Sequence, residues 1–186
     1  MNSLSEKDAK RDNILRSCFE CLVKTGLEKT SMRDLSVASG AFSSSLYYMF
    51  KNKDDIVLNS TEYGMNIVVN SLFEYAFSHI SNMKEFLNKF PSKVEEFKAE
   101  LRFIYQVVSS PRYGDRMRQM TEKLSERYDE YTDILAEYLG CSYNMLRPFV
   151  RLAIAAVLDY VIWGEQDKMQ MEMNCIYDSI IRQMDQ

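Results

Sequence analysis

The sequence has few of the residues that interrupt helices. Its 186 residues include only 6 Gly and 3 Pro. Chains built from many short strands use more of these residues at their turns. Their scarcity therefore favours long helices joined by short connections. Hydrophobic residues make up 46% of the chain, which is enough for a packed core.

Histidine and the common catalytic motifs are also scarce. His79 is the single histidine, and the sequence contains no HExxH motif, no GxSxG motif and no glycine-rich phosphate loop. Without a recognisable set of acid, base and nucleophile, the chain is not expected to be an enzyme, and no cofactor or metal is expected. An enzyme that uses the helical body is the rival hypothesis from another functional class.

Long apolar runs are missing as well. The most apolar segment, residues 152–163, is interrupted by Asp159 and stops at Gly164. It is therefore shorter than the roughly 20 residues that a membrane span needs. Residues 1–13 are polar and lack the apolar stretch of a signal peptide. From these absences we expect a cytoplasmic protein with no membrane partner.

Four cysteines are present, and two of them, Cys18 and Cys21, form a CxxC pair. A zinc site at this pair would need two further ligands nearby, and His79 is the one histidine available. Both cysteines also fall on the apolar stripe of a predicted helix. We interpret them as small buried hydrophobic residues, with metal or redox use as the alternative.

The net charge of −4 argues against a chain that binds nucleic acid over its whole surface. The first 60 residues are nevertheless close to neutral, and the acidic excess lies in the remainder. A sequence-specific DNA-binding protein needs only a local basic patch. The charge distribution is thus compatible with DNA binding by the N-terminal part.

Apolar residues recur at helical spacing along most of the chain, and no alternating run is long enough to indicate a strand. The predicted fold is therefore all-α, with about nine helices and expected breaks at Pro91 and Gly140. The predicted domains are a three-helix helix-turn-helix unit at residues 1–52 and a helical body at residues 53–186. The expected helices cover residues 6–25, 30–39, 43–50, 52–79, 83–90, 91–109, 115–139, 143–163 and 169–184.

The most informative segment is residues 30–53, where a short helix, a turn at Gly40 and a second short helix follow one another. The second helix of a helix-turn-helix enters the major groove of DNA with its N-terminal residues on the base edges. A serine-rich turn in a solvated loop is the alternative interpretation. The predicted base-facing residues are Ser43, Ser44 and Ser45, and the residues suited to phosphate oxygens are Thr30, Tyr47, Tyr48, Lys51 and Lys53.

This segment resembles the DNA-binding domain of TetR-family transcriptional repressors. The resemblance covers residues 11–58 and implies an Ω-shaped homodimer, a palindromic operator and a C-terminal body that binds a small-molecule inducer. Three positions depart from the family pattern: Phe42, where a small polar residue is usual, Ser44, where glycine is common, and Met49, where an aromatic residue or histidine is common. The matching residues are Ile14, Leu15, Phe19, Gly26, Thr30, Ser31, Met32, Asp34, Leu35, Ala38, Ser39, Gly40, Leu46, Tyr47, Phe50, Lys53 and Ile56.

The helical body offers candidates for ligand binding and for dimerisation. Ligand pockets are mostly apolar, and the candidates for lining one are Phe103, Met117, Met120, Tyr131, Tyr160 and Trp163; core packing is the alternative for each. The helix at residues 143–163 is apolar around most of its circumference, so a partner subunit is its expected cover. The predicted dimer interface consists of Ala153, Ala156, Val157, Ile176, Ile180 and Ile181.

Together these patterns predict a ligand-responsive transcriptional regulator. The hypothesis is a repressor that binds a palindromic operator on double-stranded DNA as a homodimer and is released by a small-molecule inducer. In the alternative, the chain still binds DNA, but its C-terminal body is constitutive or responds to a protein partner.

Overall fold

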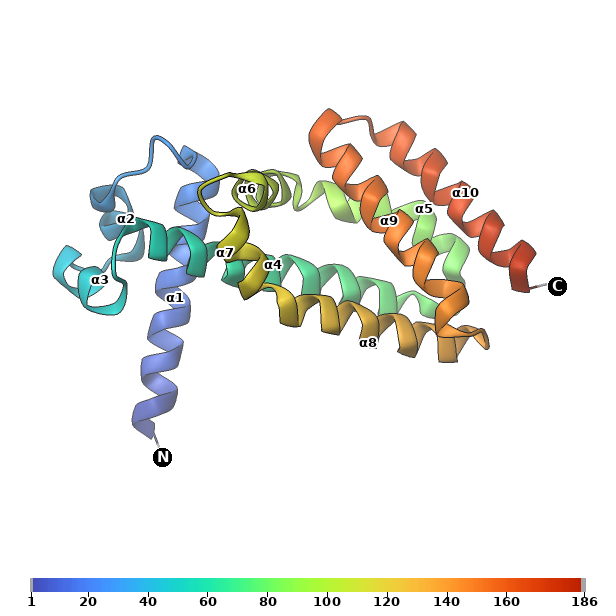
Figure 1. The fold of residues 1–186 in the computed structure, drawn as a ribbon, viewed down its shortest axis with the longest axis horizontal. Coiled ribbons are helices and arrows are strands. Elements are labelled where there is room, and N and C mark those ends of the chain that lie inside the picture. Colours follow the sequence, from blue (N-terminus) through green and yellow to red (C-terminus); the bar gives the residue numbers. More distant parts are fainter. Residues whose placement is uncertain (1, 185–186) are drawn as a thin grey trace. The chain divides into compact units, whose positions relative to one another are not determined.

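The structure, a computed structural model, describes residues 2–184 apart from the side chains of residues 2–5, 80 and 123. Within these residues the chain forms ten α-helices and one 3-10 helix, and no strand (Figure 1). The all-α prediction is confirmed, with one α-helix more than expected. The helices are α1 (Asn2–Thr25), α2 (Met32–Ser39), α3 (Ser43–Met49), α4 (Lys53–Ser78), η1 (Ile80–Asn82), α5 (Met83–Glu95), α6 (Lys98–Ser109), α7 (Gly114–Met120), α8 (Glu122–Leu139), α9 (Tyr143–Trp163) and α10 (Gln166–Met184).

The predicted break at Pro91 is wrong, because α5 continues through the proline to Glu95. A proline inside a helix leaves the carbonyl four residues earlier without its N–H partner. Here that carbonyl belongs to Leu87, and the side-chain amide of Gln170 on α10 donates to it at 3.2 Å. The orphaned carbonyl is therefore satisfied by a neighbouring helix, which makes the proline tolerable.

The helix predicted at residues 115–139 is in fact two helices, α7 and α8, which are separated at Thr121. The Thr121 hydroxyl and the Thr121 backbone N–H both donate to the carbonyl of Met117, at 2.7 and 2.9 Å. The backbone of Thr121 nevertheless leaves the helical conformation, with φ −97° and ψ 7°, and this residue is the C-cap of α7. This additional break accounts for the tenth helix.

Contacts divide the chain into two compact units. The first unit comprises residues 1–68 and 99–121, and the second comprises residues 69–98 and 122–186. The boundary predicted after residue 52 falls at the start of α4, a helix that contributes residues to both units.

The first unit has a core of aliphatic and aromatic side chains from α1, α2, α3 and the first half of α4. The apolar stripe predicted on α1 is buried, including Cys18 and Phe19. Phe19 meets Phe103 of α6 edge to face, with 5.9 Å between ring centroids. Burial raises the pKa of the Cys18 thiol to about 11, so this thiol stays protonated at neutral pH.

The close approach of α1 and α4 depends on Gly64. A Cβ atom at this position would lie 2.4 Å from the ring of Phe19. Such a distance is far inside van der Waals contact, so any larger residue would have to displace the buried ring. Gly64 therefore sets the spacing between the helix that precedes the helix-turn-helix and the helix that follows it.

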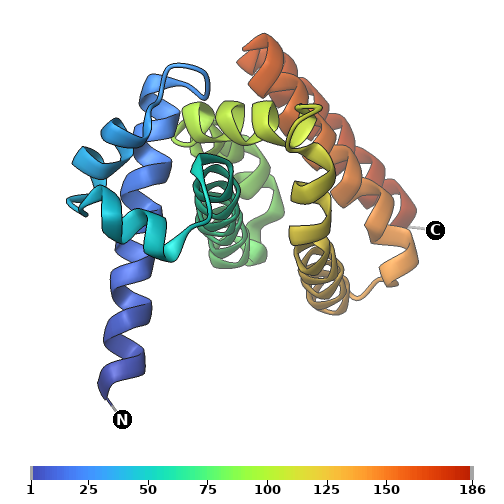
Figure 2. The same ribbon diagram turned by 60° about the vertical axis from the view of Figure 1, so that its left-hand side comes forward.

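The second unit consists of helices that pack in pairs. In it, α9 packs against α8 and α10, and α10 also packs against α5; Figure 2 shows α9 and α10 running side by side. Tyr160 and Val161 of α9 and Met169 and Met173 of α10 are fully buried. None of the helices described combines the length and the hydrophobicity of a membrane span.

Candidate DNA-binding surface

The first helix of the predicted helix-turn-helix is capped at both ends. The Ser31 hydroxyl accepts the backbone N–H of Asp34, and the Asp34 carboxylate accepts the backbone N–H of Ser31 at 2.8 Å. This reciprocal capping box fixes the start of α2, and the hydrogen bonds from Ser31 lower the pKa of Asp34. At the other end Gly40 has a φ of +63°, a left-handed conformation that glycine adopts without strain.

Two serines hold the turn between α2 and α3. The Ser36 hydroxyl donates to the carbonyl of Ala41 at 2.6 Å, and the Ser39 hydroxyl accepts the backbone N–H of Ala41 at 3.4 Å. Side chains of α2 therefore bind the backbone of Ala41, the residue that follows the turn at Gly40. The direction in which α3 leaves the turn follows from these bonds and from the conformation of Gly40.

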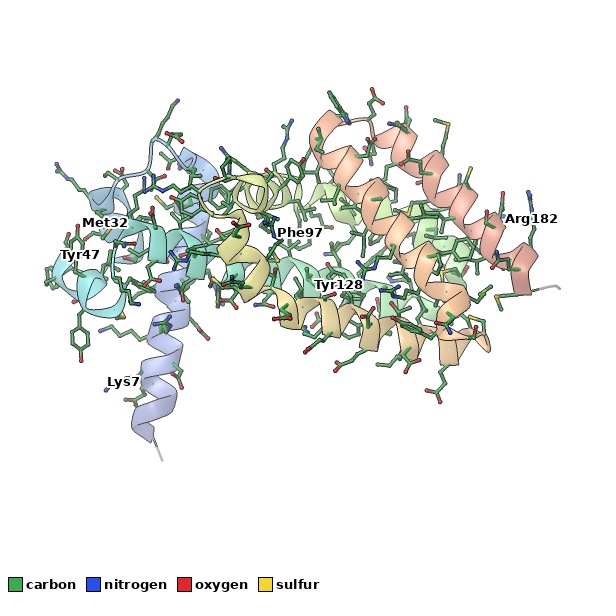
Figure 3. The ribbon with its side chains drawn as sticks, in the orientation of Figure 1. Lys7, Met32, Tyr47, Phe97, Tyr128 and Arg182 are labelled. Atoms are coloured by element: carbon green, nitrogen blue, oxygen red, sulfur yellow. The ribbon has the colours of Figure 1, made fainter. Side chains whose placement is uncertain are left out.

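The helix α3 is anchored on one side and exposed on the other, as the sequence predicted. Leu46 and the following Phe50 are buried in the core of the first unit. Ser43, Ser44 and Tyr47 are exposed, and the Tyr48 side chain is 92% exposed; Figure 3 labels Tyr47 on this helix. Ser45 is half-buried, and Lys51, just beyond α3, is exposed. The arrangement presents hydroxyls and phenols on a firmly held short helix.

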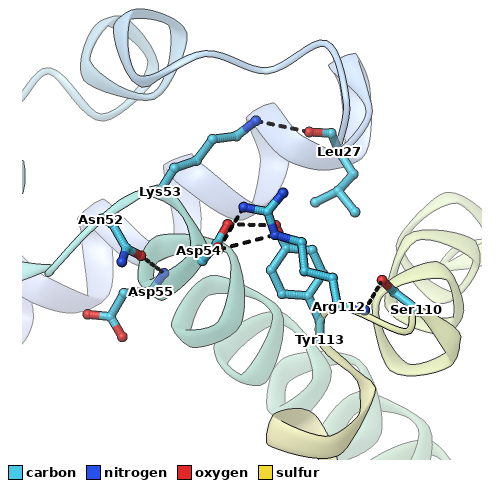
Figure 4. A network of polar contacts seen from close by, with 8 residues as sticks. All are labelled: Leu27, Asn52, Lys53, Asp54, Asp55, Ser110, Arg112 and Tyr113. Atoms are coloured by element: carbon cyan, nitrogen blue, oxygen red, sulfur yellow. Dashed lines mark hydrogen bonds and ion pairs between the residues drawn. The ribbon is translucent and has the colours of Figure 1, made fainter.

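Thr30 and Lys53 have internal partners that the sequence did not reveal. Thr30 is only 1% exposed, and its hydroxyl donates to the carbonyl of Gly26 at 2.7 Å. The ammonium of Lys53 donates to the carbonyl of Leu27 at 3.1 Å (Figure 4). Both residues thus hold the chain that follows α1. Their predicted contacts with phosphate stay predictions, and these contacts would compete with the internal bonds.

A polar network fixes the first turn of α4, directly after the helix-turn-helix (Figure 4). The Asp54 carboxylate accepts hydrogen bonds from Arg112 at 2.8 and 3.2 Å and from the Tyr113 hydroxyl at 2.8 Å. Burial opposes the charge of Asp54, but these bonds hold its pKa below the ordinary value. Burial and the bond to Asp54 raise the pKa of Tyr113 to about 12. Local sequence pattern does not predict this network, because Asp54 lies 58 and 59 positions from its two partners.

The six candidate ligand-binding residues fall in both units. In the first unit Phe103 and Met117 are buried and Met120 is half-buried. In the second unit Tyr131 stacks on Phe73 with ring centroids 4.1 Å apart, and Trp163 is exposed.

Tyr160, the remaining ligand candidate, is buried beneath a cation. The ammonium of Lys98 lies 4.7 Å from the centre of its ring, which is the geometry of a cation–π contact. Within the described residues the Tyr160 hydroxyl has no hydrogen-bond partner. A buried polar atom of this kind is compatible with a polar contact to a ligand, and its role in ligand binding stays a prediction.

The predicted dimer residues are mostly covered by their own chain. Ala156, Val157, Ile176 and Ile180 are buried, whereas Ala153 is half-buried and Ile181 is partly exposed. Because α9 and α10 pack on each other, each helix covers part of the other's apolar surface. The predicted interface does not include five apolar side chains that these two helices leave exposed, which are Leu152, Leu158, Trp163, Met171 and Met184.

Comparison with known proteins agrees with the helix-turn-helix seen in the N-terminal part and with the all-α fold of the whole chain. Residues 14–59 match the family model of bacterial regulatory proteins of the tetR family. No curated protein sequence matches the chain.

Solved structures with the same fold include transcriptional regulators from bacteria and from Haloarcula marismortui. A proposed TetR-family transcriptional regulator from Mesorhizobium loti has a TM-score of 0.69 and 13% identity, over 94% of this chain and 96% of that one. A TetR transcription regulator from Haloarcula marismortui has a TM-score of 0.64 and 14% identity, over 94% and 98%. The transcriptional regulator FadR from Bacillus subtilis, in complex with stearoyl-CoA, has a TM-score of 0.55 and 14% identity, over 90% and 96%.

Proposed function

We propose that the chain is a homodimeric transcriptional repressor that binds a palindromic operator and is released by a small-molecule inducer. The match of residues 14–59 to the family model of bacterial regulatory proteins of the tetR family supports this proposal. The observation that carries the proposal is the α2–turn–α3 geometry. Its second helix is anchored by buried residues and presents an exposed row of hydroxyls and phenols.

The proposed DNA contacts follow the exposure of the side chains. Ser43, Ser44 and Ser45 lie in the first turn of α3, from which a recognition helix reaches base edges. Tyr47, Tyr48 and Lys51 lie around them and bind phosphate oxygens, which positions the helix without reading the sequence. Thr30 and Lys53 support this surface through their bonds to the chain after α1.

The proposed homodimer uses the faces of α9 and α10 that their own chain leaves uncovered. Leu152, Leu158, Met171 and Ile181 are large apolar residues that stay exposed on these helices. Large apolar residues that stay exposed on packed helices are candidates for an interaction surface. A two-fold arrangement would cover the same surface on both copies at once, with the buried residues Ala156 and Ile180 supporting it from behind.

Two observations support a small-molecule inducer: the ligand in the similar FadR structure and the aromatic side chains in the second unit of this chain. The FadR structure holds stearoyl-CoA, and the second unit of this chain contains the aromatic side chains Tyr131 and Tyr160. Two recognition helices read successive major-groove turns about 34 Å apart. A ligand that prefers a different spacing weakens operator binding, and by linkage DNA weakens ligand binding by the same factor.

The alternative function keeps DNA binding and replaces the small ligand with a protein partner or with no effector at all. The exposed Trp163, at the end of α9, is the observation that favours a protein partner, since tryptophan is enriched at binding hot spots. Mass spectrometry of the purified protein under native conditions separates these hypotheses. A bound small molecule supports an inducer, whereas its absence together with capture of a defined protein supports the alternative.

Selection of DNA from a random-sequence pool tests the central proposal. We expect the selected sequences to converge on a palindrome whose half-sites lie one helical turn apart and which binds two protomers. The salt dependence of binding gives the number of phosphate contacts. Selected DNA without two-fold symmetry, or a single protomer on each site, would contradict the homodimeric repressor.

A further inference from the structure

Phe42 is an exposed aromatic residue at a position where a polar residue would stabilise the protein. It is the N-cap of α3, and its side chain is 82% exposed. Serine, threonine, aspartate or asparagine at an N-cap accepts a backbone N–H of the first turn. Phenylalanine cannot do so, and Phe42 makes no side-chain cap. The ring therefore contributes neither capping nor packing to the folded chain.

The backbone that carries Phe42 is nevertheless held firmly. The Ser36 hydroxyl donates to the carbonyl of the preceding Ala41 at 2.6 Å. The carbonyl of Phe42 itself accepts the N–H groups of Ser45 and Leu46 at 2.8 and 3.1 Å. With both flanking peptides bonded, the position from which the ring projects is fixed in advance of binding. Preorganisation of this kind reduces the entropy that a contact costs.

The neighbours of Phe42 have little power to discriminate between bases. Ser43, Ser44 and Ser45 carry short hydroxyls, which both donate and accept hydrogen bonds and therefore fit several base edges. An apolar ring at the start of the same helix has one natural complement in the major groove. That complement is the C5 methyl group of thymine, which the other three bases lack.

We propose that Phe42 is a specificity-determining residue that reads a thymine methyl group in each operator half-site. This inference rests on the proposed function, in which α3 enters the major groove. It explains why an exposed aromatic residue occupies an N-cap: the side chain is used in the complex rather than in the free protein. It also assigns to one residue a base preference that the three serines do not supply.

Replacement of thymine by deoxyuridine in the selected operator tests this inference, because it removes only the methyl group. One buried methyl group corresponds to about a fourfold change in affinity, and the same change in both half-sites to about 15-fold. We expect one symmetric pair of thymines to show this loss with the wild-type protein. The Phe42→Ser variant should bind the thymine and deoxyuridine operators equally well.

Two further measurements separate base reading from a structural role. The Phe42→Ser variant should melt about 2–4 °C higher than the wild type, because serine caps α3. The Val37→Ser variant removes an apolar side chain that is also well exposed, at 76%, but lies on α2. It should keep the full sensitivity of the wild type to deoxyuridine.

The outcomes distinguish this inference from the proposed function. If Phe42→Ser and the wild type lose affinity equally on deoxyuridine operators, Phe42 does not read the methyl group, although operator binding stands. The same holds if no thymine in the operator responds to the replacement. If selection yields no specific DNA at all, the proposed function fails and this inference fails with it.

Discussion

The two units of the protein expose different kinds of apolar side chain. In the first unit the most exposed aromatic residues, Phe42 and Tyr48, lie on and beside α3 among serines and close to Lys51. In the second unit most of the exposed apolar residues of α9 and α10 are aliphatic, among them Leu152, Leu158 and Met171, and Trp163 at the end of α9 is the aromatic exception. Phenols and hydroxyls suit a charged, polar partner, whereas aliphatic side chains suit an apolar one. The difference agrees with the two unlike partners proposed above, DNA for the first surface and a second copy of the chain for the second.

The largest expected effect comes from a charge in the aliphatic surface of the second unit. In Leu152→Glu each copy would bring an unpaired carboxylate into the proposed interface, and burying such a charge is strongly unfavourable. We expect monomers in sedimentation and at least a 100-fold loss of affinity for the palindrome, because one protomer reaches only one half-site.

Ile134→Glu is the matched control for this prediction. Ile134 is 51% exposed and Leu152 is 54% exposed, but Ile134 lies on α8. The control should remain dimeric. A dimeric Leu152→Glu protein, or a monomeric Ile134→Glu protein, would move the interface away from α9 and α10.

A smaller effect is expected when the packing of the first unit is disturbed. Alanine favours helices over glycine by about 1 kcal/mol, so Gly64→Ala would stabilise an isolated helix α4. In the protein the added methyl group meets the ring of Phe19 at 2.4 Å. Overpacking of this kind costs about 1–3 kcal/mol. We therefore expect a net loss of unfolding free energy in denaturant titration, while the proposed dimer through α9 and α10 persists.

The companion experiment places Gly64→Ala in a Phe19→Leu background. A smaller side chain at position 19 makes room for the methyl group, so the two substitutions should couple and the second should cost less than in the wild type. Strict additivity would show that contact with Phe19 is not the cause.

The hydroxyls of Tyr113 and Tyr128 allow a comparison of polar bonding in the two units. Tyr113, in the first unit, bonds to Asp54, and Tyr113→Phe should lower the unfolding free energy by about 1 kcal/mol at neutral pH. In the second unit burial alone raises the pKa of Tyr128 to about 12, against the opposing charges of Arg127 and Arg151. Tyr128→Phe should therefore change the neutral-pH stability less.

Both tyrosines should nevertheless lose their contribution to stability at alkaline pH. Their folded pKa values of about 12 lie above the unfolded value of about 10. The folded state thus favours the neutral phenol, and this contribution is complete below pH 10 and is lost as the pH rises toward 12. Each phenylalanine variant should weaken the alkaline decline of the unfolding free energy. An unchanged decline in both variants would contradict the cause given for the raised pKa values.

Local pattern was enough to predict most of the fold. The spacing of apolar residues predicted the buried stripe of α1 and the exposed face of α3, because both depend on residues a few positions apart. The break predicted at Pro91 failed because the partner of the Leu87 carbonyl, Gln170, lies 83 positions from Leu87 in the sequence. α7 ends at its C-cap Thr121 through a local change of backbone conformation, which the apolar pattern does not register.

In the candidate site, too, features that depend on neighbouring residues could be predicted, whereas contacts between distant segments could not. The exposure of Tyr47 and Tyr48 follows from their place on a short helix anchored by Leu46. The internal partners of Thr30 and Lys53 and the bonds of Asp54 depend on how separate segments come together. The local sequence pattern therefore predicts which side chains of the candidate surface are exposed. The hydrogen bonds that hold this surface in place depend on tertiary packing and are seen only in the structure.

The smallest expected effect concerns the two lysines that follow α3, and it sharpens the distinction between contact with DNA and support of the surface. Lys51 is exposed, whereas Lys53 donates to the carbonyl of Leu27. Lys51→Ala should weaken binding to all DNA sequences alike and reduce the salt slope by about 1, with unchanged thermal stability. Lys53→Ala removes a cation and an internal bond, so it should reduce the slope and also lower the melting temperature. A change of base preference in either variant would show that the residue reads bases, because a phosphate contact carries no sequence information.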